Sequence, residues 1–390
     1  MLICIAGKNN IAVAILDYLI KNNRNRYELG IVCNKDENSI DSWQRSLRKF
    51  AKCNMIKEYV LEDLYNIQEL IFLSMEFDSI IKPEKFLSKR LYNIHFSMLP
   101  KYKGMYTSAW PILNGEKNTG VTFHKIDSGI DTGDIIAQKE IRITEEDTCR
   151  DLYLKLIEYG INLVLNHIED VINDKCVSRK QNAKLSTYYS KESIDYDNLH
   201  INLNDTAAGI DRQIRAFSFR EYQIPTVKGH PIIETKITDI KSRKPAGSII
   251  YKSNDSMMIS TIDYNIVLYF DRFDELLTAS TIGDLKTVKD ICTSRKHVNG
   301  VNDKGWTPLI VATYNNQIEI VKYLLSVGAD ITVRNNNGTN ILMYAKDAYV
   351  NTGDNTLLKL FLELDLDIYQ KDYNDKCLID YIDFSKIGLF

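Results

Sequence analysis

The sequence lacks a long apolar run and an excess of charge of one sign. No stretch approaches the roughly 18 consecutive apolar residues that a membrane-spanning helix requires. The opening run MLICIAG is too short for the apolar core of a signal peptide. Lys and Arg number 49 against 52 Asp and Glu, so the net charge of −3 does not indicate a basic nucleic-acid-binding surface. These absences predict a cytoplasmic protein with no membrane and no nucleic-acid partner.

Cysteine pairs and glycine-rich motifs are also missing. The seven cysteines are scattered and form no C-x-x-C pair, a pattern that predicts reduced thiols and no metal site. The first strand, turn and helix contain only Gly7 where a dinucleotide-binding turn would have G-x-G-x-x-G, which argues against NAD. The 390 residues have an ordinary globular composition and are enough for two or three domains.

Apolar, strand-like runs alternate with helical segments over the first 173 residues. This order predicts an α/β domain with a mostly parallel, Rossmann-like sheet and helices on both faces. We place this domain at residues 1–180. The expected strands are 1–6, 27–33, 69–73, 91–96, 120–126 and 135–143, and the main expected helices are 11–22, 38–52 and 149–173, the last with Thr148 or Asp147 as its N-cap.

Two polar clusters suggest catalysis. In LYNIHFSMLPKYKG, which covers Leu91–Gly104, Asn93 and His95 are two residues apart on a strand and therefore share one face. The second cluster, DSGIDTGD, places Asp131 where a carboxylate could reach His95. An amide, an imidazole and an acid are the groups needed to stabilise an oxyanion and to move one proton.

Together these blocks resemble the formyltransferases that use 10-formyltetrahydrofolate. The matching patterns are N-x-H-x-S-x-L-P-x-Y-K-G and D-x-G-x-D-T-G-D. The resemblance implies that Asn93 and His95 stabilise the oxyanion of formyl transfer to an amine. It also implies that Asp131 either supports the charge on His95 or takes the proton of the amine. Whether His95 is a base or an oxyanion donor stays open.

The same resemblance implies contacts to the folate cosubstrate from two loops. The residues concerned are Met75, Glu76 and Phe77 after the third strand, and Asp127, Ile130 and Asp134 in the second block. Phe77 has a structural alternative as a core residue. His124 lies on the strand 120–126, where a lone histidine is more often structural than catalytic.

Two further stretches resemble the sugar N-formyltransferases that act on dTDP-linked aminodeoxysugars. By this resemblance Lys103 and Tyr106 lie near the sugar and phosphates, and Phe219, Arg220 and Tyr222 hold thymine and pyrophosphate. The alternative for 217–222 is a hydrophobic anchor for the linker. Lys8 and Asn9, at the end of the first strand, are either a substrate contact or a solvated turn.

The favoured acceptor is a dTDP-3-amino-3,6-dideoxyhexose of glucose or galactose configuration, used for O-antigen sugars. The resemblance implies a homodimer built through a small β domain. A dTDP-4-amino sugar is the close alternative, and hydrolysis of 10-formyltetrahydrofolate is a third possibility. A scaffold with a decayed transferase domain is the non-enzymatic alternative, but the intact Asn93, His95 and Asp131 argue against decay.

Residues 181–271 predict a linker, a helix at 205–217 and a small antiparallel β domain that contacts the nucleotide and forms the dimer. The expected strands are 231–240, 246–251, 257–261 and 265–270, separated by Gly and Asn/Asp turns.

The C-terminal part, residues 272–390, repeats with a period of 33. Ala279, Ala312 and Ala345 mark the period, and G-x-T-P-L-x-x-A resembles ankyrin repeats. A fourth copy near residues 372–381 is displaced by an insertion that we place at 349–354. Ankyrin repeats most often bind proteins, so a protein partner is expected here.

Trp306 occupies a variable position near the exposed turn of its repeat, between Gly305 and Thr307. Large apolar side chains at such positions tend to mark binding sites. With Tyr314 and Tyr344 nearby in the repeat order, Trp306 predicts a second ligand site, for which the same nucleotide sugar is a candidate.

Overall fold

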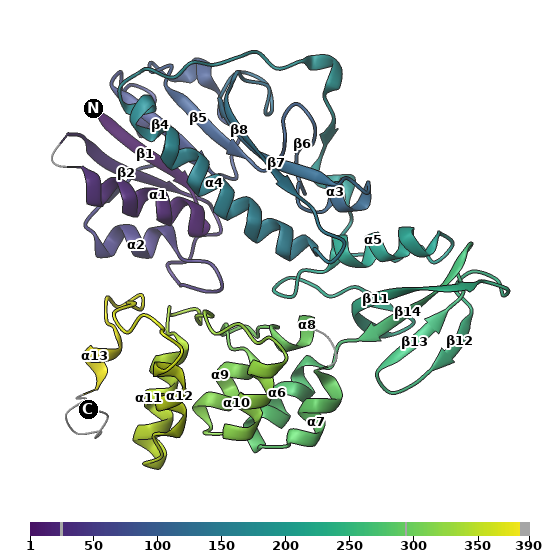
Figure 1. The fold of residues 1–390 in the computed structure, drawn as a ribbon. Coiled ribbons are helices and arrows are strands. Elements are labelled where there is room, and N and C mark those ends of the chain that lie inside the picture. Colours follow the sequence, from purple (N-terminus) through teal and green to yellow (C-terminus); the bar gives the residue numbers. More distant parts are fainter. Residues whose placement is uncertain (24–25, 293–294, 383–390) are drawn as a thin grey trace. The chain divides into compact units, whose positions relative to one another are not determined.

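The computed structural model describes residues 1–23, 26–292 and 295–382, which divide into two compact units (Figure 1). Unit 1 comprises Met1–Ile201 and Arg215–Phe219, and unit 2 comprises Asn202–Ile214 and Arg220–Phe390. Helix α5 (Ala207–Phe217) contributes residues to both units. The predicted division into three parts, after residues 180 and 271, stays a prediction.

In the described part of unit 1, seven strands form one sheet in the order β3-β2-β1-β4-β5-β7-β8. The first five are parallel, whereas β7 and β8 are antiparallel to their neighbours. This confirms the predicted mostly parallel sheet. The strands are β1 (Leu2–Gly7), β2 (Glu28–Cys33), β3 (Lys57–Glu58), β4 (Leu70–Met75), β5 (Leu91–His95), β7 (Asn118–Lys125) and β8 (Ile135–Arg142).

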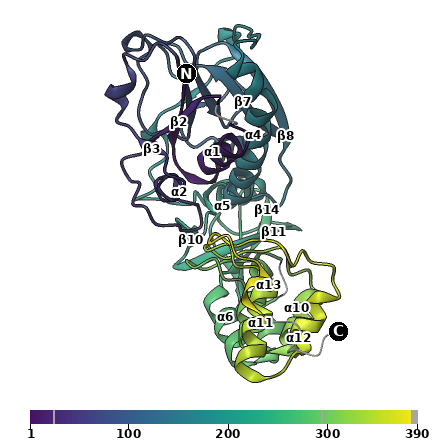
Figure 2. The ribbon, with the colours of Figure 1, turned by 90° about the vertical axis from the view of Figure 1, so that its left-hand side faces the viewer.

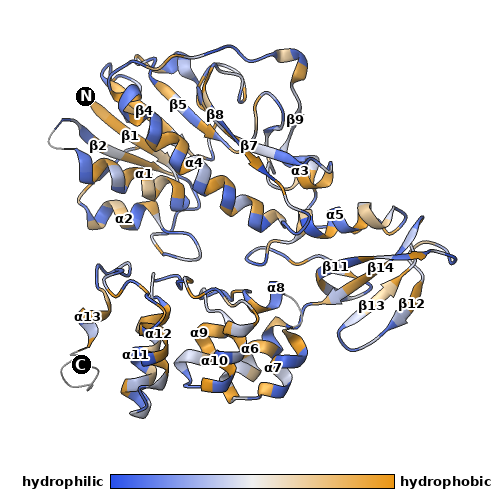
Figure 3. Ribbon diagram, in the orientation of Figure 1, coloured by the Kyte–Doolittle hydropathy of each residue, from blue (hydrophilic) through white to orange (hydrophobic). Residues whose placement is uncertain are grey.

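The two faces of this sheet are covered differently. Helices α1 (Asn9–Asn22), α2 (Leu47–Cys53) and α4 (Cys149–Ile172) join one core with Ile3 and Ile5 of β1. Figures 1 and 2 show α1 and α4 side by side. The opposite face meets the short 3₁₀ helix η1 (Leu61–Leu64) and Phe86, next to η2 (Pro83–Lys85). Because β1 and β4 are buried on both faces, they are almost entirely apolar, and Figure 3 colours them mainly orange.

Local hydrogen bonds decide where two of these helices begin. The Thr148 hydroxyl accepts from Asp151 N–H, and Asp151 in turn accepts from Thr148 N–H, which confirms Thr148 as the N-cap of α4. The prediction of a helix over 38–52 was wrong in its first half. There α2 begins only at Leu47, because the Ser46 hydroxyl accepts from Lys49 N–H and caps the helix.

A short second sheet ties the chain after α4 to the loop after β5. Its strands are β6 (Lys103–Gly104) and β9 (Tyr188–Tyr189), which pair in parallel. The neighbouring helices are α3 (Trp110–Leu113), η3 (Ala183–Leu185) and η4 (Lys191–Ser193).

The described part of unit 2 begins with a five-stranded antiparallel sheet in the order β10-β11-β14-β13-β12. Its buried residues include Met257, Ile259, Ile266 and Leu268, which alternate along β13 and β14. The predicted small antiparallel sheet is therefore confirmed. Its strands are β10 (Thr226–Val227), β11 (His230–Lys241), β12 (Ile249–Lys252), β13 (Ser256–Ile259) and β14 (Tyr264–Phe270).

Among the described residues, three helix pairs follow the sheet and match the 33-residue period. The periodic Leu276, Leu309 and Leu342 are fully buried, which confirms the repeat. Helix α11 has 12 residues whereas the equivalent α9 has seven, which agrees with the insertion placed at 349–354. The predicted fourth copy, near residues 372–381, contains the short helix α13. The helices are α6 (Phe273–Ile282), α7 (Leu285–Ile291), α8 (Arg295–Val298), α9 (Pro308–Tyr314), α10 (Ile318–Ser326), α11 (Ile341–Thr352), α12 (Thr356–Leu362) and α13 (Leu378–Tyr381).

Candidate active site

The carboxyl end of β5 and the loop after β7 bring the three predicted catalytic residues into contact. Asn93 and His95 lie on β5, and Asp131 comes from the loop between β7 and β8. The Asp131 carboxylate is 3.5 Å from Nδ1 of His95 and 3.4 Å from Nδ2 of Asn93. An acid, an imidazole and an amide therefore meet at one point, at the edge of the sheet where parallel α/β folds bind ligands.

Both ring nitrogens of His95 face oxygen atoms. Nε2 lies 2.8 Å from the carbonyl oxygen of Tyr102, which can only accept, so Nε2 carries a hydrogen and donates it. Nδ1 faces Asp131. Because the hydrogen on Nε2 is held by the carbonyl, a proton that His95 gains or loses is exchanged at Nδ1.

Asp131 is a nearly buried carboxylate surrounded by polar groups. Gly104 N–H donates to its Oδ2 at 3.0 Å, and Nε2 of His124 lies 3.7 Å from its Oδ1. Burial alone would raise the pKa of the Asp131 carboxyl, but the contacts with His95, His124 and Gly104 hold the pKa well below its usual value. Asp131 also has a positive φ of 54°, an unusual conformation for this residue type that the surrounding contacts maintain.

His124 belongs to this site, although the sequence favoured a structural role for it. Its Nδ1 donates to the Lys125 carbonyl at 2.7 Å, so its Nε2 accepts from Nδ2 of Asn93 at 3.1 Å. The register places His124 directly opposite Asn93. The signal in the sequence was a polar residue in an otherwise buried strand, and only the pairing of β5 with β7 shows what that residue contacts.

The predicted folate contacts after β4 are partly buried in the fold. Met75 has no exposed surface, and the Phe77 ring packs edge-on against Phe72 with 6.2 Å between centroids, which favours its structural alternative. The Glu76 carboxylate accepts from the Tyr153 hydroxyl at 2.7 Å and from Nδ2 of Asn9 at 3.2 Å. Burial raises the pKa of the Glu76 carboxyl, against the opposing effect of these two hydrogen bonds.

The predicted contacts in the second block have mixed surroundings. Asp127 is exposed and accepts from Gly129 N–H and from the Thr132 hydroxyl, so it shapes the turn itself. Ile130 is 41% exposed and is available to a ligand. Asp134 accepts through its backbone carbonyl from Lys125 N–H.

Four of the five predicted substrate contacts in unit 1 lie in its first 106 residues. Lys8 forms an exposed ion pair with Asp36 at 2.8 Å, and Asn9 is part of the Glu76 cluster. Lys103 is buried although it is charged, whereas the half-buried Tyr106 packs edge-on against Tyr196.

Phe219, Arg220 and Tyr222 have different environments in the two units. In unit 1 Phe219 is buried and packs against Trp43 and Tyr153, at centroid distances of 5.4 and 5.6 Å. This favours the alternative of a hydrophobic anchor. In unit 2 Arg220 donates to both carboxylate oxygens of Asp271 at 2.7 and 2.8 Å, and Tyr222 is 66% exposed.

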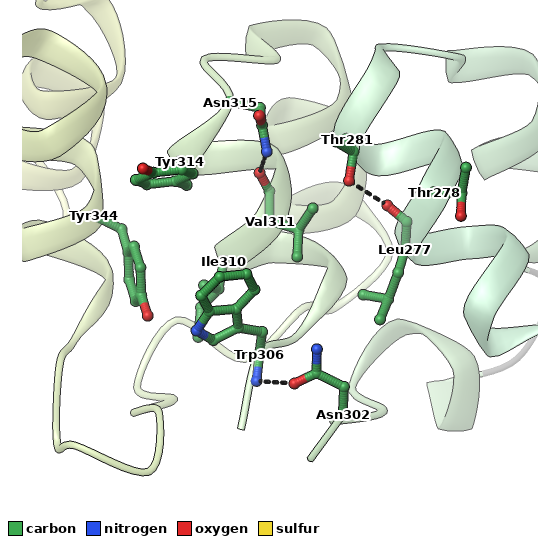
Figure 4. Close-up of a pocket in the computed structure, with 10 residues that line it drawn as sticks. All are labelled: Leu277, Thr278, Thr281, Asn302, Trp306, Ile310, Val311, Tyr314, Asn315 and Tyr344. Atoms are coloured by element: carbon green, nitrogen blue, oxygen red, sulfur yellow. Dashed lines mark hydrogen bonds between the residues drawn. The ribbon is translucent and has the colours of Figure 1, made fainter. Parts of the chain in front are cut away.

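A cavity of about 380 Å³ lies between the first helices of consecutive repeats, and Trp306, Tyr314 and Tyr344 all line it (Figure 4). These are the three residues from which the sequence predicted a second ligand site. The Trp306 ring stacks on Tyr314 and meets Tyr344 edge-on. Leu277, Thr278, Thr281, Asn302, Ile310, Val311 and Asn315 complete the lining.

Two other features are absent from the described residues. No group of three or more His, Cys, Asp or Glu side chains there is arranged to hold a metal ion. None of the described helices combines the length and the apolar character that crossing a membrane requires.

Comparisons with known proteins place this geometry in a family. The formyl transferase family model matches residues 68–168, and a model of three ankyrin repeats matches 276–372. The methionyl-tRNA formyltransferase of Malacoplasma penetrans is 32% identical over 226 residues, which cover 56% of this chain and 70% of that protein. The chain belongs to the formyltransferase family. The match to four other methionyl-tRNA formyltransferases spans only 54–57% of their length.

Two solved formyltransferase structures are more similar in sequence. An N-formyltransferase from Helicobacter canadensis, in complex with folinic acid and dTDP-3-aminofucose, is 43% identical with a TM-score of 0.65. The match covers 69% of this chain and 99% of that one. WlaRD, a sugar 3N-formyltransferase solved with dTDP and 5-N-formyltetrahydrofolate, is also 43% identical, with a TM-score of 0.65 and coverage of 70% and 98%.

The raised pKa of the Glu76 carboxyl leads us to expect that the stability of this formyltransferase depends on pH. A carboxyl whose pKa is raised by folding stabilises the fold fully below the unfolded value of about 4.3, and this contribution is lost as the pH rises through the folded value. As the pH rises above about 4.3 we therefore expect the free energy of unfolding of the wild type to fall relative to Glu76→Gln.

Denaturant unfolding followed by tryptophan fluorescence, in a Trp306→Phe background, measures this difference in unit 1. Trp43 and Trp110 of unit 1 are then the remaining tryptophans of the chain. Trp43 also contacts Tyr153, the hydrogen-bond partner of Glu76. A difference in free energy between the two proteins that does not change with pH would contradict the prediction.

Proposed function

We propose that the protein transfers the formyl group of 10-formyltetrahydrofolate to the amine of a dTDP-linked 3-amino-3,6-dideoxyhexose. The observation that carries this proposal is the contact of Asn93, His95 and Asp131 at one sheet edge. The 43% identity over almost the whole length of two sugar N-formyltransferases supports the choice of acceptor. Use of the product in O-antigen sugars stays a prediction.

In the proposed reaction the neutral amine attacks the formyl carbon, and a tetrahedral intermediate with a negatively charged oxygen forms. Nδ2 of Asn93 can turn one N–H toward this oxyanion, because its contact with Asp131 is long at 3.4 Å. Asp131, ionised at neutral pH because of its lowered pKa, accepts the amine proton directly or through Nδ1 of His95. The intermediate then collapses: the bond between the formyl carbon and N10 of the folate breaks, and N10 takes up the same proton and leaves as tetrahydrofolate.

The structure offers support against a decayed transferase. All three proposed catalytic side chains are in contact, and the backbone of Asp131 has a positive φ. A protein that had lost the reaction would have no use for a buried carboxylate at this position, since burying a charge costs free energy.

The acceptor is tested by mixing the purified protein with 10-formyltetrahydrofolate and one candidate at a time. The candidates are the dTDP-3-amino- and dTDP-4-amino-dideoxyhexoses of glucose and galactose configuration, methionyl-tRNA, and water alone. We expect a 3-amino sugar to gain one formyl group by mass spectrometry, and His95→Ala to lose about 10²–10³ in rate. His167→Ala, a histidine on α4 that bonds its own helix, is the matched control.

Formylation of a 4-amino sugar instead would change the regiochemistry, and folate release without an acceptor would identify a hydrolase. No product with any acceptor, while folate still binds, would reject formyl transfer to these acceptors.

We also propose that the ankyrin cavity binds the same nucleotide sugar at a second site. The half-buried Trp306, with Tyr314 and Tyr344, offers ring surfaces to a base, and Asn302, Thr281 and Asn315 provide polar groups. A protein partner on the repeats is the alternative.

Trp306→Ala tests the second site by calorimetric titration with dTDP. We expect two sites for each chain in the wild type and one in Trp306→Ala, because losing a stacking ring costs about 1–3 kcal/mol. Tyr369→Ala, which removes an exposed ring of the repeats that does not line the cavity, is the control. Unchanged stoichiometry and kinetics in Trp306→Ala would reject the second site.

The exposed edge of the unit 2 sheet supports the proposed homodimer. Ile249, Ile250 and Tyr251 of the edge strand β12 are 44, 37 and 60% exposed. An apolar edge strand of this kind tends to pair with another chain.

Ile250→Lys places a charge at that edge, and we expect it to convert the dimer to a monomer in light scattering coupled to gel filtration. Ile40→Lys, at an exposed apolar residue of unit 1, should leave the oligomeric state unchanged. A wild type that already elutes as a monomer would reject the dimer.

A further inference from the structure

Residues 179–189, here called the strap, run along both loops that build the candidate active site. At one end Arg179 and Ile135 exchange two backbone hydrogen bonds of 2.8 Å at the start of β8. In the middle Gln181 reaches the loop of Asp131. At the other end β9 pairs with β6, in the loop that follows His95. The strap is far in sequence from both motifs, and it contacts both.

Thr187 binds the backbone of Tyr102, the residue whose carbonyl accepts from His95. Its hydroxyl accepts from Tyr102 N–H at 2.7 Å, and its carbonyl accepts from Lys103 N–H at 3.0 Å. Tyr102 has a positive φ of 57°, which is unfavourable for a side chain of this kind and needs external contacts to persist. The carbonyl of the same residue accepts from Nε2 of His95. The Thr187 hydroxyl therefore binds the same residue, Tyr102, whose carbonyl orients the imidazole.

Tyr189 acts on the donor to Asp131. Its carbonyl accepts from Met105 N–H at 2.9 Å, and a Cβ on Gly104 would lie 2.2 Å from it. Only glycine allows this approach and the φ of 88°, which together aim Gly104 N–H at the Asp131 carboxylate. The Tyr189 ring stacks on Tyr102 and on Trp110, at centroid distances of 5.7 and 4.1 Å.

Gln181 holds Asp131 from the other side. Its Nε2 donates to the backbone carbonyls of Asp131 and Gly133, each at 2.8 Å. These two bonds fix the main chain of Asp131, whose own φ is positive. Gln181 therefore supports the backbone of the acid itself, Asp131, and Thr187 supports Tyr102, whose carbonyl orients the imidazole.

Hydrogen bonds hold the strap in place, and the strap buries little surface. Residues 182–188 are all exposed, so they contribute little apolar burial. Removing one anchoring group should therefore disturb the geometry of the site more than the stability of the whole unit.

We propose that Gln181 and Thr187 are positioning residues that set the orientation of His95 and Asp131, so that the rate of the chemical step depends on the strap. This inference rests on the proposed formyl transfer at the same site. Neither residue touches the reacting atoms. Gln181 acts through the backbone of Asp131. Thr187 acts through Tyr102, which holds His95.

Thr187→Val tests the proposal in the full-length protein, because it keeps the shape of the side chain and removes the hydroxyl. We expect kcat to fall about tenfold or more while KM for both substrates changes less than about threefold, since misplaced catalytic groups affect the chemical step. Thr187→Ser keeps the hydroxyl and should restore kcat. Thr144→Val, at an exposed threonine of unit 1, is the control.

A second readout does not need activity. In protein labelled with ¹⁵N-histidine, the ring signals of His95, assigned by their loss in His95→Ala, should move in Thr187→Val and stay in place in Thr187→Ser. If Thr187→Val does not fold, Gln181→Glu replaces it, because it removes both N–H donors at nearly constant shape.

Unchanged His95 ring signals in these variants would overturn the proposal whatever the value of kcat. A loss of kcat that serine does not restore would overturn it as well. If the wild type formylates no acceptor, the proposed function fails, and the ring signals alone decide whether the strap positions His95.

Discussion

A buried negative charge is the constraint on which unit 1 depends. Asp131 is 12% exposed in its side chain, and a carboxylate there is stable only with donors on several sides. The polar groups around it come from different parts of the chain: Asn93 and His95 from β5, His124 from β7 and Gly104 N–H from β6. The need to bring them together explains why both motif loops have one compact arrangement.

This arrangement imposes unusual backbone conformations. Asn9, Glu76, Tyr102, Tyr106 and Asp131 all have positive φ values, and all were predicted site residues or lie in the predicted motifs. Such conformations persist only where surrounding contacts maintain them, and they tend to occur at functional sites. Here the contacts are the Tyr153 hydroxyl on Glu76 and the strap on Tyr102 and Asp131. The sheet supplies a rigid base, and hydrogen bonds across the loops complete the site.

The repeats of unit 2 are stabilised in a different way from the site in unit 1. They are stabilised by regularly spaced buried leucines and by threonine and asparagine caps such as Thr307 and Asn340. Because the buried core positions of the repeats are equivalent, the repeats differ from one another mainly in the side chains at variable positions. Trp306 is such a position, and its ring lines a cavity.

The sequence by itself determined the mostly parallel sheet, the antiparallel strands after it, the ankyrin period and the meeting of Asn93, His95 and Asp131. These features are written in local patterns: alternation of apolar residues, a 33-residue repeat, and two motifs whose spacing on a strand and a loop is short. The cavity at Trp306 also followed from its place in the repeat. Where local hydrogen bonds competed with a helical pattern, as at Ser46, the prediction was wrong.

Only the tertiary structure decided the partners of these residues. His124 beside Asn93, Tyr153 on Glu76, Asp271 on Arg220 and Thr187 on Tyr102 are pairs that no local pattern links. It also decided that Phe219 is buried against Trp43. The physical reason is that a hydrogen bond or a ring contact depends on distance in space, and residues 30 to 90 positions apart become neighbours only when the sheet and its loops have packed.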